Sequence, residues 1–177
     1  MGVVLAGGQS RRFGSDKALA RLDGATLLEL AVGRLAGWCD AVVVAGRAEA
    51  PCEVVADWPA PGMGPLGGIA GALRLARARG FDAVLTCGVD SPGLPDDLAA
   101  LLAPGPAYVA DQPVIALWPV AAAEVVADIL QADGRHSMLA LAEAMGARPV
   151  RLTRPASNVN SPDDLAALGG RPESPAG

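Results

Sequence analysis

Residues 3–17 read VVLAGGQSRRFGSDK: a short apolar run breaks into two glycines and then into a polar segment with three cations. The run Val3–Ala6 is typical of a buried strand, and Gly7 and Gly8 form a turn where bare backbone can approach a ligand closely. Backbone N–H groups beside two arginines and a lysine suit the many charged oxygens of a polyphosphate. Because glycines, cations and position converge, the stretch favours a phosphate site over an ordinary turn with solvated arginines.

This stretch matches neither of the two common glycine fingerprints. A P-loop needs G-x-x-x-x-G-K followed by Ser or Thr, whereas Lys17 follows Asp16 and precedes Ala18. A dinucleotide fingerprint needs G-x-G-x-x-G at the start of a helix, and residues 7–12 lack that spacing. The loop therefore predicts a polyphosphate site of another type and disfavours an NAD-dependent oxidoreductase.

Short β-branched runs alternate with alanine- and leucine-rich stretches along the chain. The expected strands are Val3–Ala6, Ala41–Ala45, Val54–Ala56, Ala83–Cys87, Pro149–Leu152 and, from weaker patterns, Tyr108–Ala110 and Val114–Leu117. The expected helices are Thr26–Ala36, Leu66–Arg79, Pro95–Leu102, Ala121–Ala132, Ser137–Met145 and Pro162–Leu168. This alternation predicts a mostly parallel sheet covered on both faces, which is a three-layer α/β/α fold of Rossmann-like type. Ligands of such folds bind at the carboxyl ends of the central strands.

Length and charge bound the possible functions. At 177 residues the chain is long enough for a full core, and we expect a single domain over 1–168 with a disordered tail over 169–177. A formal net charge of −5 and a pI near 4.8 argue against binding to nucleic acid or to a membrane surface.

Cysteine usage and hydropathy indicate the compartment. Cys39, Cys52 and Cys87 form no C-x-x-C pair and no group with histidine, which argues against structural zinc and a disulfide framework. The chain shows no signal-peptide pattern and no apolar stretch of membrane-spanning length. We therefore expect a cytoplasmic protein.

Two carboxylates stand just after predicted strands. Asp90 follows Ala83–Cys87 and Asp57 follows Val54–Ala56, so both belong at the sheet edge that carries the glycine loop. A carboxylate beside a polyphosphate is repulsive unless a cation lies between them, and Mg²⁺ typically uses one or two carboxylates plus phosphate oxygens. From position alone, Asp90 fits a Mg²⁺ ligand and a turn-forming residue before Ser-Pro equally well.

Several other segments leave two roles open. The glycine-rich run 61–69 can present backbone amides to a ligand or pack a helix closely on the sheet. Asn158 and Asn160 can bind a ligand, but their place in a polar turn before a helix favours a turn-shaping role. His136 predicts a surface position, and its neighbour Arg135 is a weakly supported contact for an anionic second substrate.

The pattern LAGG-x-S-x-R-x-G-x-DK over residues 5–17 closely resembles the molybdenum cofactor guanylyltransferase family. These are small nucleotidyltransferases with a Rossmann-like fold of glycosyltransferase-A type. The resemblance continues in order through nearly the whole chain, at Asp57 and at residues 64–68 (GPLGG), 90–95 (DSPGLP), 112–117 (QPVIAL) and 158–162 (NVNSP).

The resemblance implies that GMP is transferred from GTP to Mo-molybdopterin with release of pyrophosphate and with Mg²⁺ as cofactor. It implies that GTP is bound by Leu5, Ala6, Gly7, Gly8, Lys17, Asp57 and Asp90. Asp90 would also bind Mg²⁺, and Arg12, Lys17 and Asp90 would carry catalysis. Other molybdenum cofactor biosynthesis proteins and apo-molybdoenzymes are the implied protein partners. One departure is that residues 44–47 (VAGR) lack the asparagine with which the family often contacts the nucleotide.

Three alternatives accompany this prediction. A molybdenum cofactor cytidylyltransferase is the nearest, although its first loop tends to read Ala-Ala-Gly where this chain has Ala6-Gly7-Gly8. Another small NTP transferase shares the opening motif. A non-catalytic nucleotide-binding domain is disfavoured, because it has no need of a metal carboxylate at Asp90 beside Lys17 and Arg12.

Overall fold

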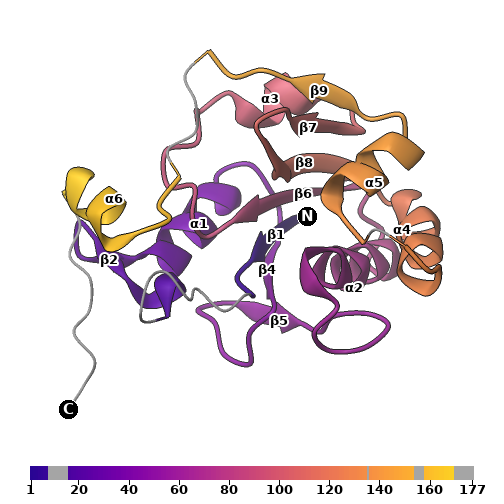
Figure 1. Ribbon diagram of the computed structural model, residues 1–177, viewed down its shortest axis with the longest axis horizontal. Coiled ribbons are helices and arrows are strands. Elements are labelled where there is room, and N and C mark those ends of the chain that lie inside the picture. The colour runs from indigo at the N-terminus through magenta and orange to yellow at the C-terminus, as the bar shows by residue number, and fades with distance from the viewer. Residues whose placement is uncertain (8–15, 135, 154–157, 170–177) are drawn as a thin grey trace.

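The computed structural model describes residues 1–7, 16–134, 136–153 and 158–169, and it forms a sheet flanked by helices (Figure 1). The strands are β1 (Gly2–Leu5), β2 (Arg21–Leu22), β3 (Ala25–Thr26), β4 (Val42–Ala45), β5 (Glu53–Val55), β6 (Ala83–Gly88), β7 (Ala107–Val109), β8 (Gln112–Pro119) and β9 (Arg148–Val150). The helices are α1 (Leu27–Ala36), α2 (Gly64–Ala78), α3 (Leu98–Leu102), α4 (Ala122–Gln131), α5 (Met138–Ala144) and α6 (Pro162–Ala167), with a 3₁₀ turn η1 (Lys17–Leu19).

The main sheet has seven strands in the order β5-β4-β1-β6-β8-β7-β9. Strands β5, β4, β1 and β6 are mutually parallel, as expected. Strand β8 differs, because it runs antiparallel to both β6 and β7. The physical reason is the connection: β7 and β8 are joined by Ala110 and Asp111 alone, and two residues can join only antiparallel neighbours.

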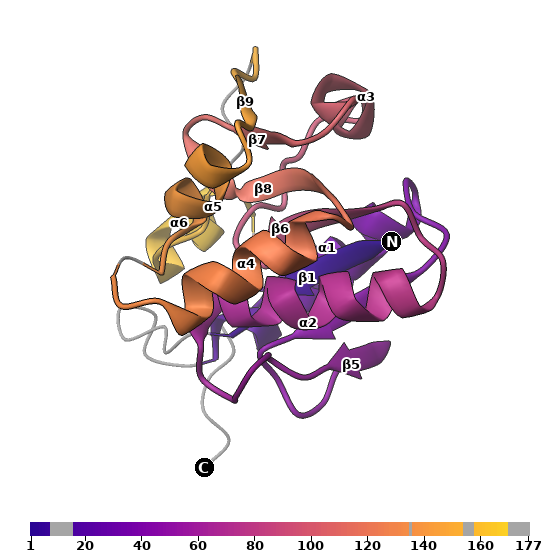
Figure 2. The ribbon, with the colours of Figure 1, turned by 90° about the vertical axis from the view of Figure 1, so that its right-hand side faces the viewer.

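Both faces of the sheet are buried, because alternate residues of each central strand enter different cores. Val3 and Val43 join the core under α2 and α4, whereas their neighbours Val4 and Val44 join the core under α1 and α3. Helices α2 and α4 lie side by side across one face in Figure 2. The expected three-layer α/β/α arrangement is confirmed, and the all-apolar strands are its direct signature.

The order of the strands places a switch point at β1. Strand β1 pairs with β4 on one side and with β6 on the other, so the chain leaves β1 and β6 at the same edge of the sheet. Leu5 pairs with Gly88, and the segments that follow each of them emerge together. Ligands of open α/β sheets bind at this kind of position.

A small third core joins residues 20–27 to the C-terminal turn and α6. Ala20, Leu22 and Leu27 pack with Val159 and Leu165, which brings α6 onto the β2–β3 hairpin. The sequence analysis missed this hairpin, although the signal was present. Its turn is Asp23-Gly24, and both residues have positive φ, as hairpin turns of this type require.

Helix α1 begins where the sequence predicts, whereas helix α3 begins later. Thr26, the first residue of the expected helix Thr26–Ala36, is the N-cap of α1 and forms a reciprocal hydrogen-bonding box with Glu29. Helix α3 is shorter than predicted: it begins at Leu98, and Pro95 belongs to the preceding turn, where its carbonyl accepts from the Leu98 N–H. Among the described residues, no helix combines the length and the apolar character that crossing a membrane requires.

Helix α2 lies against the strands through glycine, which yields a stability prediction. A Cβ on Gly71 would overlap the carbonyl oxygen of Ala56, whereas a Cβ on Gly33 in α1 would meet nothing. We expect Gly71→Ala to lower the free energy of unfolding by about 1–3 kcal/mol, because backbone must shift. The matched control Gly33→Ala should raise it by about 0.5–1 kcal/mol. Urea unfolding measures both, and equal effects would contradict the packing argument.

Candidate active site

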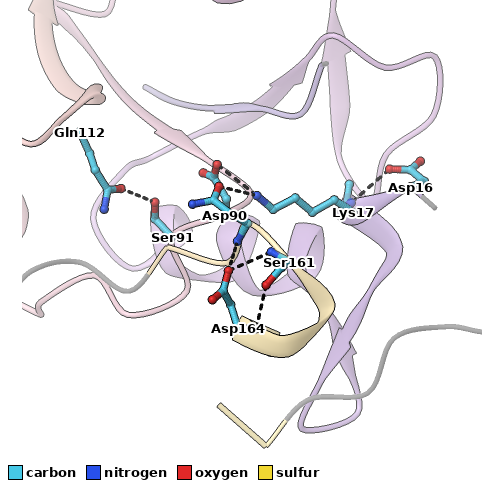
Figure 3. Close-up of polar contacts among 9 residues, drawn as sticks. Asp16, Lys17, Asp90, Ser91, Gln112, Ser161 and Asp164 are labelled. Atoms are coloured by element: carbon cyan, nitrogen blue, oxygen red, sulfur yellow. Dashed lines mark hydrogen bonds and ion pairs between the residues drawn. The ribbon is translucent and has the colours of Figure 1, made fainter. Parts of the chain in front are cut away.

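Lys17 is held at the edge of the sheet by a short capped turn. The Asp16 side chain accepts a hydrogen bond from the Ala18 N–H at 3.1 Å, which begins η1. The Lys17 side chain is 11% exposed, and its Nζ lies 3.4 Å from Asp90 Oδ2 and 3.5 Å from Asn160 Oδ1. Figure 3 shows the Lys17 side chain extended toward Asp90. The two residues that the sequence singled out at different strand ends therefore meet.

Asp90 is positioned by its own loop and by the C-terminal turn. A Cβ on Gly88 would stand 2.5 Å from Asp90 Oδ1, so glycine there leaves room for the carboxylate. The Asp90 carbonyl accepts from the Val159 N–H at 2.8 Å. The next residue, Ser91, donates its hydroxyl to Gln112 Oε1 at 2.7 Å and so ties the loop to β8. The carboxylate itself is one-third exposed and open to ligands.

The C-terminal turn contributes a residue whose role the sequence analysis underrated. Asn160 was expected mainly to shape the turn, and its side-chain oxygen also accepts from Lys17. The turn is shaped by Asp164, which accepts from the Asn160 and Ser161 N–H groups at 2.9 Å. Figure 3 shows Asp164 beside Ser161. These donors, the Asn160 N–H above all, hold the pKa of Asp164 below its ordinary value.

The end of β1 is packed against the end of β4. The Ala6 N–H donates to the Ala45 carbonyl at 3.0 Å. Gly46 has φ +83°, and a Cβ there would stand 2.5 Å from both N and Cα of Gly7. Backbone therefore touches backbone at this strand end, where residues 44–47 lack the asparagine that the family resemblance led us to expect. Leu5 is buried, Ala6 is half-buried and Gly7 is exposed, so the strand opens to solvent along the predicted nucleotide segment.

Asp57 follows β5, which lies two strands from β1 in the sheet, and it packs against the first turn of α2. Its Oδ2 accepts from the Gly62 N–H at 3.1 Å. A Cβ on Gly67 would stand 3.2 Å from Asp57 Cβ, and one on Gly68 would stand 2.8 Å from Ala45 Cβ. The glycines of this run thus serve close packing of helix on sheet, which was one of the two roles the sequence left open.

Some predicted residues lie outside the described part of the chain. Gly8 and Arg12 belong to residues 8–15, and Arg135 is likewise outside it. His136 is exposed, as predicted, with Nε2 3.0 Å from the Ala132 carbonyl. Cys87 is fully buried beneath Asp90, and burial raises the pKa of its thiol to about 12, so it is a neutral packing group.

A pocket of about 380 Å³ adjoins Asp90. Its lining includes Asp90, Gln112, Val114, Met138, Leu139 and Asn158. These residues come from the β6 loop, from β8, from the start of α5 and from the C-terminal turn. Asp90 therefore has Lys17 as an ion-pair partner and also borders a partly apolar hollow.

In the part of the chain that the structure describes, acidic, histidine and cysteine side chains do not gather into a closed metal site. Within the described ranges, no three of them lie close enough to hold an ion by themselves. A single exposed carboxylate beside a lysine suits a metal that completes its coordination with ligand phosphates and water. The arrangement is suited to holding a charged polyphosphate against Lys17 and a second compound in the pocket.

Comparison with known proteins agrees with this geometry. The family model described as a MobA-like NTP transferase domain matches residues 2–156. The molybdenum cofactor guanylyltransferase of Acidiphilium cryptum is 36% identical, over 96% of this chain and 94% of that protein. The protein of the same name from Rhodobacter capsulatus is also 36% identical, over 93% of this chain and 92% of that protein.

Solved structures share the fold at lower sequence identity. Molybdopterin-guanine dinucleotide biosynthesis protein A from Archaeoglobus fulgidus superposes with a TM-score of 0.74 at 23% identity, covering 95% of this chain and 96% of that one. A 2-C-methyl-D-erythritol 4-phosphate cytidylyltransferase from Thermus thermophilus reaches 0.60 at 18% identity, covering 94% and 95%. The family-model match and the full-length relatives show that this chain belongs to the MobA-like NTP transferase family, with the molybdenum cofactor guanylyltransferases.

Proposed function

We propose that this protein transfers GMP from GTP to Mo-molybdopterin, forming molybdopterin guanine dinucleotide and pyrophosphate with Mg²⁺ as cofactor. The observation that carries the proposal is the meeting of Lys17 and Asp90 at the switch point of the sheet, 3.4 Å apart. Relatives that are 34–37% identical along nearly the whole chain and are named molybdenum cofactor guanylyltransferases support the choice of nucleotide and acceptor.

The chemistry requires positioning more than proton transfer. A phosphate oxygen of molybdopterin attacks the α-phosphorus of GTP, a new P–O bond forms, and the bond to the bridging oxygen breaks as pyrophosphate leaves. The nucleophile is already ionised, so no strong general base is needed. Lys17 offers three N–H donors, of which two face Asp90 and Asn160, and its charge offsets the charge on the phosphates.

Asp90 suits the role of Mg²⁺ ligand. Gly88 leaves its carboxylate room, and Lys17 is the cation that faces it in the structure. When bound, Mg²⁺ supplies positive charge to the phosphate oxygens and orients them. Asp90 would then hold the ion at the end of β6 while Lys17 turns its ammonium to the triphosphate. Leu5, Ala6, Gly7, Gly8 and Asp57 would complete the nucleotide side, and Arg12 would add charge to the catalytic pair.

The pocket beside Asp90 is a suitable acceptor site. A pterin is flat and carries hydrogen-bonding edges, and the lining combines apolar Val114, Met138 and Leu139 with polar Gln112 and Asn158. A pterin held here would bring its phosphate toward Asp90, where the nucleotide α-phosphate is expected. The acceptor and nucleotide would thus approach the metal carboxylate from different sides.

The cellular setting follows from the same proposal. We infer a cytoplasmic location, as the cysteine pattern of the sequence led us to expect. Other molybdenum cofactor biosynthesis proteins would deliver the acceptor, and apo-molybdoenzymes would receive the product.

The direct test is incubation with Mo-molybdopterin, Mg²⁺ and one nucleotide at a time. We expect pyrophosphate and the dinucleotide with GTP, and neither with ATP. Product with CTP but not with GTP would show that the protein is a cytidylyltransferase. No product with any nucleotide would refute the proposal.

Removing the Lys17 charge should slow the chemical step. Lys17→Met keeps much of the packed stem and removes the ammonium, so we expect kcat to fall on the order of 10²–10³-fold. Steady-state kinetics of pyrophosphate release measures this. The control Arg77→Met removes a charge from an exposed ion pair with Glu124 and should leave kcat unchanged.

Removing the Asp90 charge should abolish the stimulation of turnover by Mg²⁺. Asp90→Asn keeps the shape of the side chain, so we expect loss of Mg²⁺-stimulated turnover and of the Mg²⁺-dependent gain in GTP affinity seen by calorimetry. Asp96→Asn makes the same change at a fully exposed carboxylate of the same loop and should behave as wild type. Near-normal Mg²⁺ stimulation in Asp90→Asn would contradict the assignment.

Filling the pocket should affect the acceptor alone. Leu139 is half-exposed at the start of α5, and Leu139→Trp should raise KM for Mo-molybdopterin on the order of 10-fold or more with KM for GTP unchanged. Leu101→Trp on α3 is the control for adding an indole to the surface. An equal rise in both KM values would argue against a separate acceptor pocket.

A further inference from the structure

Arg47, in the loop after β4, forms an ion pair with the residue just before Lys17. Its Nη1 lies 2.7 Å from Asp16 Oδ2, and its side chain is only 18% exposed. The other carboxylate oxygen, Asp16 Oδ1, accepts from the Ala18 N–H at 3.1 Å. One carboxylate therefore joins two segments: it caps the turn that carries Lys17 and holds that turn to the loop after β4.

The loop that carries Arg47 is itself well anchored. Arg47 Nε donates to the Glu49 carbonyl at 3.3 Å. The preceding residue, Gly46, has φ +83° and touches the Gly7 backbone. The loop after β4 thus contacts the end of β1 and the start of η1, and these are the two described boundaries of the segment 8–15.

The ammonium of Lys17 depends on this support, because its own contacts are long. Distances of 3.4 and 3.5 Å to Asp90 and Asn160 lie at the limit of hydrogen bonding and restrain the group weakly. The place of Lys17 Nζ is therefore set by the packed stem of the side chain, which is 11% exposed, and by the backbone turn that carries it, which begins at Asp16. The Asp16 side chain is 46% exposed, and an ion pair open to solvent on one side typically adds only ~0–1 kcal/mol to stability, so we expect the pair to contribute little to the free energy of unfolding.

We propose that Arg47 is a positioning residue that acts through Asp16 to aim Lys17 at the phosphates of the bound nucleotide. Its catalytic consequence rests on the proposed function. At this strand end Arg47 pairs with Asp16, and its proposed role is to fix the cation rather than to touch the substrate. A displacement of the order of 1 Å of such a group is enough to slow a reaction on the order of 10²-fold.

Kinetics of three variants tests the pairing. Asp16→Asn keeps the capping oxygen and removes the charge, and Arg47→Ala removes the partner. We expect either variant to lower kcat about 10-fold or more with a smaller change in KM for GTP, and the double variant to be no worse than the more severe single one. Arg47→Lys should restore part of kcat.

The control is Arg79→Ala, which removes an ion pair of the same 2.7 Å length with Glu53 at the far end of α2. It should leave kcat and KM unchanged. Thermal unfolding of every variant separates loss of folding from loss of positioning, and we expect midpoints close to wild type. Additive losses in the double variant would overturn the pairing.

A second measurement needs no activity, because Lys17 is the only lysine in the sequence. Isotope-labelled lysine gives one side-chain NMR signal, which reports the surroundings of this ammonium alone. We expect that signal to shift and sharpen in Arg47→Ala and to stay in place in Arg79→Ala. An unmoved signal in Arg47→Ala overturns the proposal. If wild-type protein transfers no GMP, the proposed function fails, and this signal still decides whether Arg47 positions Lys17.

Discussion

The burial of β1 between two parallel neighbours is the constraint on which the rest of the structure depends. Val3 and Val4 are fully buried on opposite faces, so β1 can lie only where helices cover both sides of the sheet. With β4 on one side and β6 on the other, the chain after each strand must emerge at one edge. That edge carries Lys17 and Asp90, although 73 positions separate them in the sequence.

The segment after Lys17 and the C-terminal helix α6 meet through an apolar contact rather than a polar one. Val159 and Leu165 are fully buried against Ala20, Leu22 and Leu27. Burial of this small cluster brings the C-terminal turn to the Lys17 turn, and the long polar contacts follow from it. Packing of this cluster therefore brings the Asn160 turn and the Lys17 turn together.

Several features were predictable because their causes are local. Apolar runs such as Val42–Ala45 and the Thr26 cap determine strands and helix starts from neighbouring residues alone. The antiparallel course of β8 was not predicted, because the expected strands ended at Ala110 and resumed only at Val114, which concealed the two-residue connection that causes it. Asn160 was underrated because nothing next to it in the sequence indicates that its oxygen faces Lys17.

The amino-acid sequence by itself determined the three-layer class, the glycine loop after the first strand, the strand-end carboxylates and the family likeness. These follow from periodicity and from short motifs, which act over a few residues. Only the tertiary structure decided that Asp90 and Asn160 share Lys17, that glycines 67 and 68 pack the helix closely on the sheet, and that Arg47 reaches Asp16. Each of these depends on strand order and on which distant surfaces are buried together, and that is settled by the packing of the whole chain.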